Sequence, residues 1–195
     1  MSDSLSVPKL LSLPSNNDSA GQPYSSRASE QFLRFHLMPD MTALLPIQQV
    51  TEVLTIANGQ IVPIFHMPPW VLGVYNWRGE ILWMIDLGYL LGLTACYQEP
   101  ITGSAYKAVV LQARFNPTTS TNIKSQMLGL IVNRVEDIEW CNPDLIQSPP
   151  SSTVTPELVP FLRGYWLKPN GEILVVMDGQ AIIAAMPKSS VSADC

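Results

Sequence analysis

The sequence predicts an all-β fold of small barrels with a few short helices, and three observations lead to that prediction. From residue 31 onward the chain repeats short apolar runs that are rich in β-branched and aromatic residues. Glycine, proline and asparagine bound these runs, as they bound strands joined by tight turns. Only two segments have helical spacing, and both are short. Many short strands with so few helices are typical of small β-barrels.

The first run, QFLRFHLM, alternates between two faces, as a strand does. Arg34 and His36 share one face with Phe32 and Met38, while Leu33, Phe35 and Leu37 share the other. The remaining runs are also short and rich in β-branched and aromatic residues. The expected strands, in chain order, are 31–38, 60–64, 70–76, 80–86, 107–115, 127–135 and 172–178.

Several of these strands are apolar on both faces. In EILWMID, Ile81, Trp83 and Ile85 face one way, and Leu82 and Met84 face the other. Such a strand must be covered twice, either by two β-layers or by a partner protein. We therefore expect Ile81, and Ile173 in the similar segment EILVVMD, to lie in the core.

The two expected helices follow an aspartate that can cap their first turn. In DLGYLLG, Asp86 precedes leucines at helical spacing, and Gly92 ends the helix. In DGQAIIAAMP, Asp178 takes the same place, and Pro187 ends the helix.

An internal repeat links these segments. GEILWMID (79–86) and GEILVVMD (171–178) share their first four residues and their last, and each reads as a turn, a strand, a capping aspartate and a short helix. The repeated order predicts two similar β-subdomains, in which these strands occupy equivalent places.

Other stretches read as irregular. Residues 1–29 are serine-rich and poor in large apolar residues, so they are expected to form a disordered, dispensable tail, with residues 188–195 as a flexible one. Residues 115–126 read as a polar loop. Proline-rich residues 142–160 are expected to cross the surface with at most a short helical turn.

Composition restricts the function. The 195-residue chain carries a net charge of −5, which argues against a nucleic-acid binder that needs a basic face. No run is long and apolar enough for a membrane span, so we expect a cytoplasmic protein without direct membrane insertion. The three cysteines, Cys96, Cys141 and Cys195, are far apart and predict free thiols.

Nothing in the sequence indicates catalysis. Two histidines without metal-ligand spacing, and the absence of a phosphate-binding glycine loop, predict neither a metal site nor a cofactor. Glu136, Asp137 and Glu139 form an acidic run that we interpret as a solvated face. A small barrel could instead bind a small ligand or an oligonucleotide, and this alternative stays open.

The turn in YNWRGE raises a separate question, because Asn76 and Gly79 suffice to make it. Two interpretations are possible for the intervening Trp77 and Arg78. In the first, Trp77 folds back on the barrel and Arg78 pairs with a nearby carboxylate. In the second, the two form a partner-binding hot spot, a role in which both residue types are enriched.

The sequence from residue 31 to 186 resembles that of a known protein family. FLRFHL resembles its opening strand, and LPIQQVTEV its Val-x-Glu segment, here Val50 and Glu52. Its most specific motif matches at Pro69, Gly73, Val74, Asn76, Arg78, Gly79, Asp86 and Leu87. The chain is identified as resembling the CheW-type coupling proteins of chemotaxis, and MPPWVLGVYNWRGEILWMIDLG resembles their cyanobacterial branch.

The resemblance implies a domain over residues 30–187 made of two interleaved, five-stranded, SH3-like barrels on a shared core. It implies a non-catalytic adaptor between the regulatory domain of a CheA-type histidine kinase and the cytoplasmic tip of methyl-accepting chemoreceptors. The adaptor would be recruited to membrane receptor arrays and could serve phototaxis or pilus-based motility. The implied partner-binding residues are Val50, Glu52, Asn76, Trp77, Arg78 and Gly79, with Glu52 pairing with Arg78. Trp77 departs from the family, which usually has Leu, Ile or Val there, and this puts the identity of the partners in question.

Overall fold

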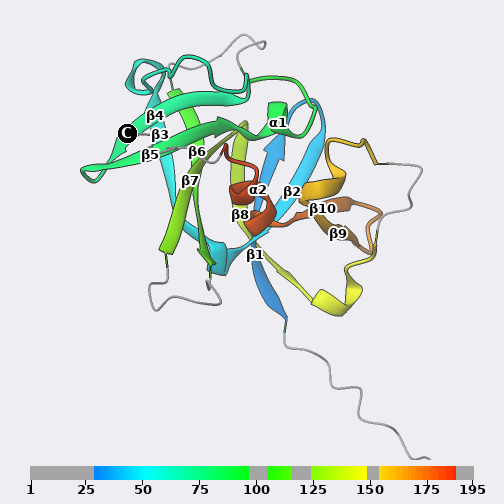
Figure 1. Ribbon diagram of the computed structural model, residues 1–195. Coiled ribbons are helices and arrows are strands. Elements are labelled where there is room, and N and C mark those ends of the chain that lie inside the picture. The colour runs from blue at the N-terminus through cyan, green and yellow to red at the C-terminus, as the bar shows by residue number, and fades with distance from the viewer. Residues whose placement is uncertain (1–28, 97–104, 116–123, 149–153, 188–195) are drawn as a thin grey trace, which may run out of the picture.

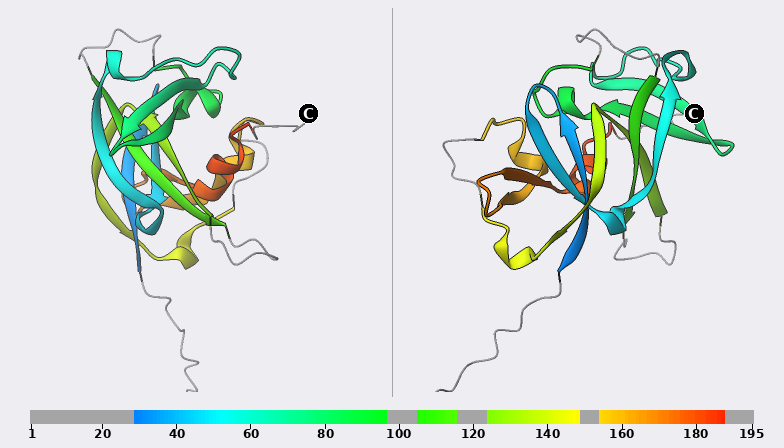
Figure 2. Two further views of the ribbon diagram at one scale, coloured as in Figure 1. Left: turned by 60° about the vertical axis from the view of Figure 1, so that its left-hand side comes forward. Right: turned by 180° about the vertical axis from the view of Figure 1, so that it is seen from behind.

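Ten β-strands in two five-stranded sheets make up most of the chain that the computed structural model describes, which is residues 29–96, 105–115, 124–148 and 154–187 (Figure 1). Sheet A has the strand order β8–β1–β2–β10–β9, and sheet B has the order β3–β6–β7–β5–β4. Both sheets are strongly curled (Figure 2). The all-β prediction is confirmed, and the two predicted tails, residues 1–29 and 188–195, lie outside the described residues, apart from Ser29.

The strands of sheet A are β1 (Glu30–Leu37), β2 (Met41–Pro46), β8 (Arg134–Cys141), β9 (Leu162–Leu167) and β10 (Ile173–Met177). Those of sheet B are β3 (Val50–Ala57), β4 (Val71–Trp77), β5 (Glu80–Asp86), β6 (Ala105–Phe115) and β7 (Lys124–Val132). Short 3-10 turns η1 (Ile47–Gln49), η2 (Asn58–Gln60), η3 (Pro143–Leu145) and η4 (Val159–Phe161) connect them.

The two sheets are built from two chain repeats that exchange strands. The first repeat, β1 to β5, places β1 and β2 in sheet A and its other three strands in sheet B. The second repeat, β6 to β10, places β6 and β7 in sheet B and the rest in sheet A. The last strand of each repeat has equivalent neighbours. β5 pairs with β4 in an antiparallel hairpin and with β7 of the second repeat in parallel. β10 pairs with β9 in an antiparallel hairpin and with β2 of the first repeat in parallel. The predicted equivalence of residues 79–86 and 171–178 is confirmed.

Both predicted helices are present, and each begins at its aspartate. Asp86 precedes α1 (Leu87–Leu90) and accepts a hydrogen bond from the Tyr89 backbone N–H at 3.1 Å. Asp178 precedes α2 (Gly179–Ala184) and accepts from the Gln180 and Ala181 N–H groups at 2.9 and 3.2 Å. Asp86 is buried and also accepts from the Cys96 N–H at 2.6 Å, whereas Asp178 is exposed.

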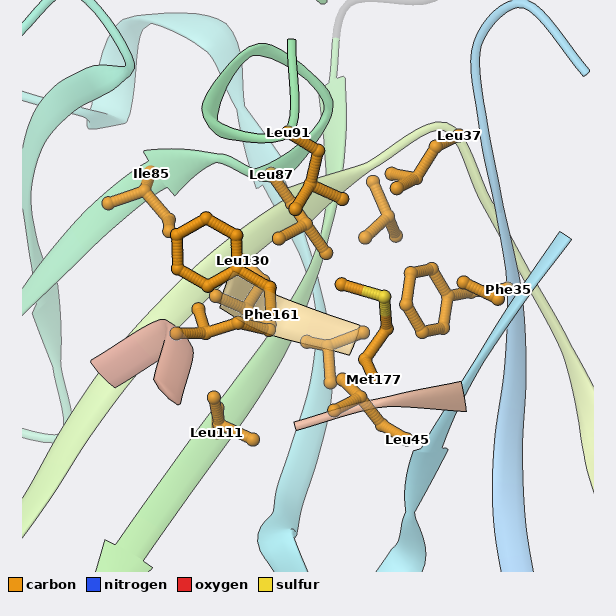
Figure 3. Packing of buried hydrophobic residues seen from close by; sticks show 14 of the residues in the cluster. Phe35, Leu37, Leu45, Ile85, Leu87, Leu91, Leu111, Leu130, Phe161 and Met177 are labelled. Carbon is orange, nitrogen blue, oxygen red and sulfur yellow. The ribbon is translucent and has the colours of Figure 1, made fainter. Parts of the chain in front are cut away.

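One core joins the two sheets, and each sheet also encloses a smaller core of its own. The shared core contains Phe35 and Leu45 of sheet A, Leu111 and Leu130 of sheet B, and side chains of both helices (Figure 3). The core inside sheet B contains Ile56, Trp77, Leu82, Met84, Ala108, Val110 and Ile131. The core inside sheet A contains Phe32, Leu44, Cys141, Trp166, Leu174 and Val176. The two-sided apolar strands are covered by this pair of layers.

Two of the expected strands differ in the structure. Residues 60–64 form no strand: η2 and Pro63 interrupt the segment, and only Val62 makes an isolated bridge, to Val74 of β4. Residues 127–135 are divided between β7 and β8. The chain turns at Asn133, whose N–H donates to the His36 carbonyl at 3.1 Å and whose side-chain oxygen accepts from the Met38 N–H at 3.0 Å.

The prediction that Ile81 and Ile173 are core residues is wrong. Ile81 is 77% exposed and Ile173 is 59% exposed, although Leu82 and Leu174 beside them are buried. Both isoleucines lie next to a hairpin turn, where the strand extends past the shared core. The face of β5 that carries Ile81 becomes partly covered at Trp83 and fully buried at Ile85.

Candidate functional site: the β4–β5 hairpin

The β4–β5 hairpin projects from the body of the molecule and reverses through Arg78 and Gly79 (Figure 2, right). Their φ angles are +55° and +86°, which is the pattern of a two-residue type I′ turn. The side-chain oxygen of Asn76 accepts a hydrogen bond from the Gly79 N–H at 3.0 Å, so these two residues supply the turn chemistry that the sequence predicts. Arg78 therefore occupies a left-handed backbone position that a non-glycine residue adopts rarely.

Trp77 is the last residue of β4 and folds back into the molecule. It is 8% exposed and packs in the core of sheet B with Leu82, Val110 and their neighbours. For Trp77 the structure shows the first of the two interpretations. The indole is a buried anchor under the turn, and the exposed side chain of the pair is that of Arg78, at 67%.

Glu52 joins the two residues of the hairpin to β3. Its Oε2 accepts from Arg78 Nη2 at 2.9 Å and from Trp77 Nε1 at 3.0 Å. The Arg78 guanidinium carbon also lies 4.9 Å from the centre of the Trp77 ring, within cation–π range. The predicted Glu52–Arg78 pair is confirmed as an intramolecular contact.

Val50 does not belong to this cluster. A β-bulge in β3 separates Val50, which pairs with Leu111, from Glu52, which pairs with Val110. Since Leu111 lies in the shared core and Val110 in the core of sheet B, the bulge turns Val50 and Glu52 to opposite faces. The structure thus brings together Glu52, Asn76, Trp77, Arg78 and Gly79, and it places Val50 against the shared core.

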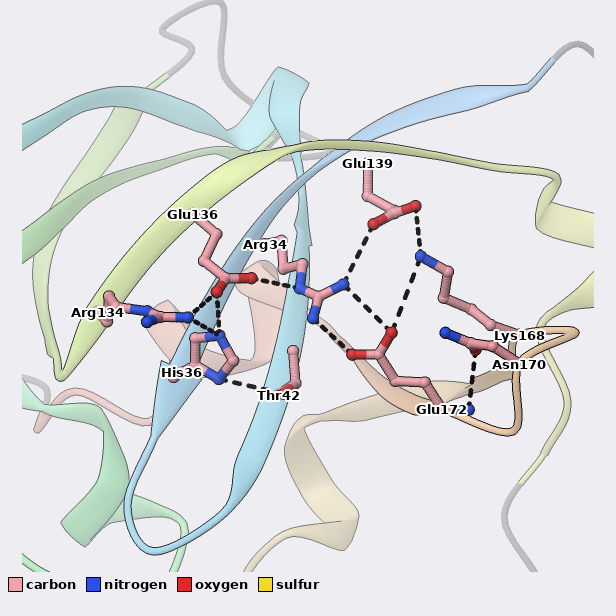
Figure 4. Close-up of polar contacts among 9 residues, drawn as sticks. All are labelled: Arg34, His36, Thr42, Arg134, Glu136, Glu139, Lys168, Asn170 and Glu172. Atoms are coloured by element: carbon pink, nitrogen blue, oxygen red, sulfur yellow. Dashed lines mark hydrogen bonds and ion pairs between the residues drawn. The ribbon is translucent and has the colours of Figure 1, made fainter.

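Sheet A carries a charged cluster that sequence reasoning missed. Arg34 forms ion pairs with Glu136 at 2.6 Å, with Glu139 at 3.4 Å and with Glu172 at 2.5 Å (Figure 4). Lys168, at the β9–β10 turn, pairs with Glu139 at 2.9 Å. We call these five residues the Arg34 cluster. The interpretation of residues 136–139 as a solvated face is wrong for Glu136 and Glu139, whose side chains are only 23% and 24% exposed.

The charges in this cluster stabilise one another. Burial acts to lower the pKa of Arg34, but the hydrogen bond and the charge of Glu172, with Glu136 and Glu139, outweigh it and raise that pKa. The hydrogen bond with His36, at 2.8 Å, is the largest cause of the lowered pKa of Glu136, and Arg134 and Arg34 add to it against the effect of burial. The sequence signals for the cluster were Arg34 in a largely apolar strand and the acidic run at Glu136 and Glu139, and nothing local in the sequence links the two.

The Arg34 cluster and the Glu52–Arg78 pair occupy equivalent ends of the two sheets. In sheet B, Met84 pairs with Gly129, which pairs with Val110, which faces Glu52 across the bulge. In sheet A, Val176 pairs with Leu44, which pairs with Arg34, which faces a bulge between Val135 and Ile138. Arg34 therefore stands where sheet B has Val110. In sheet A three glutamates form ion pairs with Arg34, whereas in sheet B the turn cation, Arg78, is exposed to solvent.

No helix in the described ranges is long and apolar enough to cross a membrane. Residues 31–186 match the family model of the CheW-like domain. The chain is 36% identical over 76 residues to the chemotaxis protein CheW of Rhizobium meliloti (strain 1021), a match covering 39% of this chain and 40% of that protein. It is 29% identical over 85 residues to a probable chemotaxis protein CheW of Rhizobium etli, covering 44% and 46%. The matches thus span less than half the length of these curated relatives.

Among solved structures, the fold is similar to that of the scaffolding protein TtCheW from Thermoanaerobacter tengcongensis. The TM-score is 0.60 at 22% identity, over 77% of this chain and 89% of that chain. This likeness confirms the predicted fold of two five-stranded SH3-like subdomains. Because the family model matches four-fifths of the sequence, the chain belongs to the CheW-like domain family.

Proposed function

We propose that this protein is a scaffold that couples chemoreceptors to a CheA-type histidine kinase, and that the β4–β5 hairpin is one of its partner contacts. The observation that carries the proposal is the state of Arg78. Its side chain is two-thirds exposed at the tip of a projecting hairpin, while Glu52 and Trp77 contact its guanidinium. A cation fixed in this way, with further donors facing solvent, is suited to a contact.

The family supports a function without chemistry. CheW-like proteins are non-catalytic scaffolds, and the curated relatives are named as chemotaxis proteins. The partners we propose are the kinase regulatory domain and the cytoplasmic helical tip of methyl-accepting receptors. The protein would then act in the cytoplasm, recruited to receptor arrays. Phototaxis or pilus-based motility remains a proposal that depends on the resemblance to the cyanobacterial branch.

Within the proposed site the residues have different tasks. Arg78 makes the contact, Glu52 and Trp77 hold it, and Asn76 and Gly79 form the turn that presents it. Val50 contributes through the shared core, by fixing the bulge that directs Glu52 toward the hairpin. For the alternative of a small-ligand or oligonucleotide module, the described residues leave no space inside either sheet, because buried side chains fill both interiors.

The test compares Arg78→Ala and Arg78→Lys with the wild type in thermal melts and in binding titrations. The titrations use the purified regulatory domain of the cognate CheA-type kinase and a receptor tip fragment. Arg78 forms an exposed ion pair, so both variants should keep stability to within about 1 kcal/mol. Binding should weaken by about 2 kcal/mol, and lysine should not restore it, because a point charge does not replace a planar donor group.

Arg163→Ala is the matched control. Arg163 is an exposed cation on β9, far from the hairpin in the strand order, and it pairs only loosely with Glu30, at 3.8 Å. Its loss should leave binding unchanged. If Arg78→Ala and Arg163→Ala weaken binding equally, the effect comes from the loss of one positive charge and not from the hairpin. If Arg78→Ala binds as the wild type does, the proposed site is refuted. A strain that lacks the gene, scored for motility direction and pilus function, tests the pathway separately.

A further inference from the structure

We infer that Trp77 is a positioning residue for the partner contact: it orients Arg78 through Glu52 and through its own ring, without touching the partner. The inference rests on the proposed function, since it assigns Trp77 a task within that same site. Trp77 is 8% exposed, so little of it is accessible to a second protein. Its effect on binding must therefore pass through its neighbours.

Two contacts give Trp77 this control. Its indole N–H and the Arg78 guanidinium donate to the same carboxylate oxygen of Glu52, at 3.0 and 2.9 Å. The indole donor fixes the carboxylate, and the carboxylate then fixes one nitrogen of the guanidinium. The ring itself lies 4.9 Å from the guanidinium carbon and restricts the plane of that group.

The indole can position its neighbours because core packing holds it in one place. It is packed in the core of sheet B, and it is paired with Glu80 across the hairpin. An aliphatic residue at position 77 could fill the same core. It could supply neither the N–H donor nor the aromatic face, so Arg78 would keep its backbone position and lose its side-chain orientation.

The β9–β10 hairpin also combines a tryptophan, a cation and carboxylates, but there the cation is mostly buried. Lys168 lies 5.6 Å from the centre of the Trp166 ring and pairs with Glu139 at 2.9 Å and Glu172 at 3.9 Å. Its side chain is only 21% exposed. The β4–β5 and β9–β10 hairpins thus each place a tryptophan ring beside a turn cation that a carboxylate binds, and of these two cations Arg78 of sheet B is the more exposed.

The test uses Trp77→Phe, which keeps a ring and removes the N–H donor, and Trp77→Leu, which removes both contacts. The first measurement needs no partner. In the free protein, the Nε–Hε NMR signal of Arg78, assigned by its absence in Arg78→Ala, should report an ordered side chain in the wild type. Order should fall in Trp77→Phe and fall further in Trp77→Leu. A signal that is equally ordered in Trp77→Leu would overturn the inference.

The second measurement is a double-mutant cycle on binding to the kinase regulatory domain and the receptor fragment. Trp77→Leu should weaken binding up to about tenfold in the wild-type background, the scale for immobilising one long side chain. It should add almost nothing in the Arg78→Ala background. Equal weakening in both backgrounds would show that Trp77 only stabilises the barrel, and would overturn the inference.

The controls separate this inference from the proposed function. Trp166→Phe makes the matching change in sheet A and should leave binding unchanged. If Arg78→Ala binds as the wild type does, the proposed function fails, and the NMR measurement still decides whether Trp77 orders Arg78. Trp77→Phe keeps most of the buried volume, so it provides both readouts even where Trp77→Leu does not fold.

Discussion

Ile81 and Leu82 are neighbours on β5, yet they differ in exposure from 77% to 1%. Replacing Leu82 with alanine removes buried groups from the core of sheet B and should lower the free energy of unfolding by about 2–5 kcal/mol. Ile81→Ala removes an exposed side chain and should change it by less than about 0.5 kcal/mol. Urea unfolding of both variants makes the measurement. A loss from Ile81→Ala comparable with that from Leu82→Ala would mean that this end of the strand is covered.

Gly73 is the residue on which β4 most depends for its path. Its φ is +140°, and a Cβ added there would lie 2.1 Å from the Val62 carbonyl oxygen, which is paired with β4. Gly73→Ala should therefore cost more than about 2 kcal/mol of stability, the scale of a strained backbone position combined with a clash. Gly59→Ala is the control, because a Cβ there meets nothing within 4 Å. Similar melting temperatures for the two variants would contradict the described path of residues 62–73.

The starts of the two helices differ in burial, and this separates the effects of their caps. Asp86→Ala would remove a buried acceptor from the partly buried N–H groups of Tyr89 and Cys96, and should cost about 2–3 kcal/mol. Asp178→Ala leaves the N–H groups of Gln180 and Ala181 to hydrogen-bond with water and should cost about 1 kcal/mol. Calorimetry of both variants, with Asp86→Asn as the conservative replacement, tests the difference. Equal losses would show that burial of Asp86 adds nothing.

The ion pairs between β8 and β1 should make stability depend on pH. Arg34 and His36 of β1 and Arg134 of β8 face Glu136, whose pKa is lowered in the folded state. A lowered folded pKa means that its contribution is present above the unfolded value, about 4.3, and is lost as the pH falls through the folded value. Glu136→Gln should thus cost about 1–3 kcal/mol at pH 7.

The stability difference between wild type and Glu136→Gln should begin to narrow as the pH falls below about 4.3 and should close as the pH passes the lower pKa of the folded state. The exposed neighbour provides the control, since Asp137→Asn should leave stability unchanged at either pH. Urea unfolding at pH 7 and pH 3.5 distinguishes the two carboxylates. A difference that persists at low pH would mean that Glu136 contributes by its shape and not by its charge.

The elements that the sequence predicts correctly are those with strong local signals. Asp86 and Asp178 cap helices because a carboxylate next to a helical leucine or isoleucine pattern has few other uses. The strands around residues 80–86 and 172–178 follow from composition. β2, β3 and β9 are not predicted from the sequence. β2 and β9 are short and contain proline or arginine, so they look like loops, and β3 mixes its apolar residues with Thr51, Glu52 and Thr55. Residues 127–135 look like one strand, although Asn133 turns the chain.

The residues of the candidate site also differ in how strong a local signal the sequence gives for them. Asn76 and Gly79 are recognisable because turns have a local chemistry, and Glu52 enters only through the family resemblance. The contact between Glu52 and Trp77 joins residues 25 positions apart and depends on a bulge that no local pattern encodes. The Arg34 cluster is harder still, since its members come from β1, β8 and the β9–β10 hairpin.

At the scale of the whole molecule, strand exchange makes the two sheets depend on each other. Each repeat supplies two strands to one sheet and three to the other, so neither repeat contains a complete sheet. Fragments 1–100 and 101–195 should therefore be unfolded as monomers, because each would expose the shared core and strand edges. Mixed in equal amounts, they should recover the near-UV circular dichroism of the intact chain. Cooperative melting of either fragment as a monomer would contradict this prediction.

The exchange also has an evolutionary reading. Two identical copies of one repeat could form the same pair of sheets as a symmetric dimer, each copy lending two strands to the other. Joining the copies end to end removes the constraint of identity, and afterwards each half can change alone. Here sheet A has Arg34 with three carboxylates directed toward it, while sheet B has Val110 at the equivalent position and leaves Arg78 exposed. A gene duplication could thus turn a symmetric ancestor into a protein with two different ends, as the proposed link between unlike partners would require.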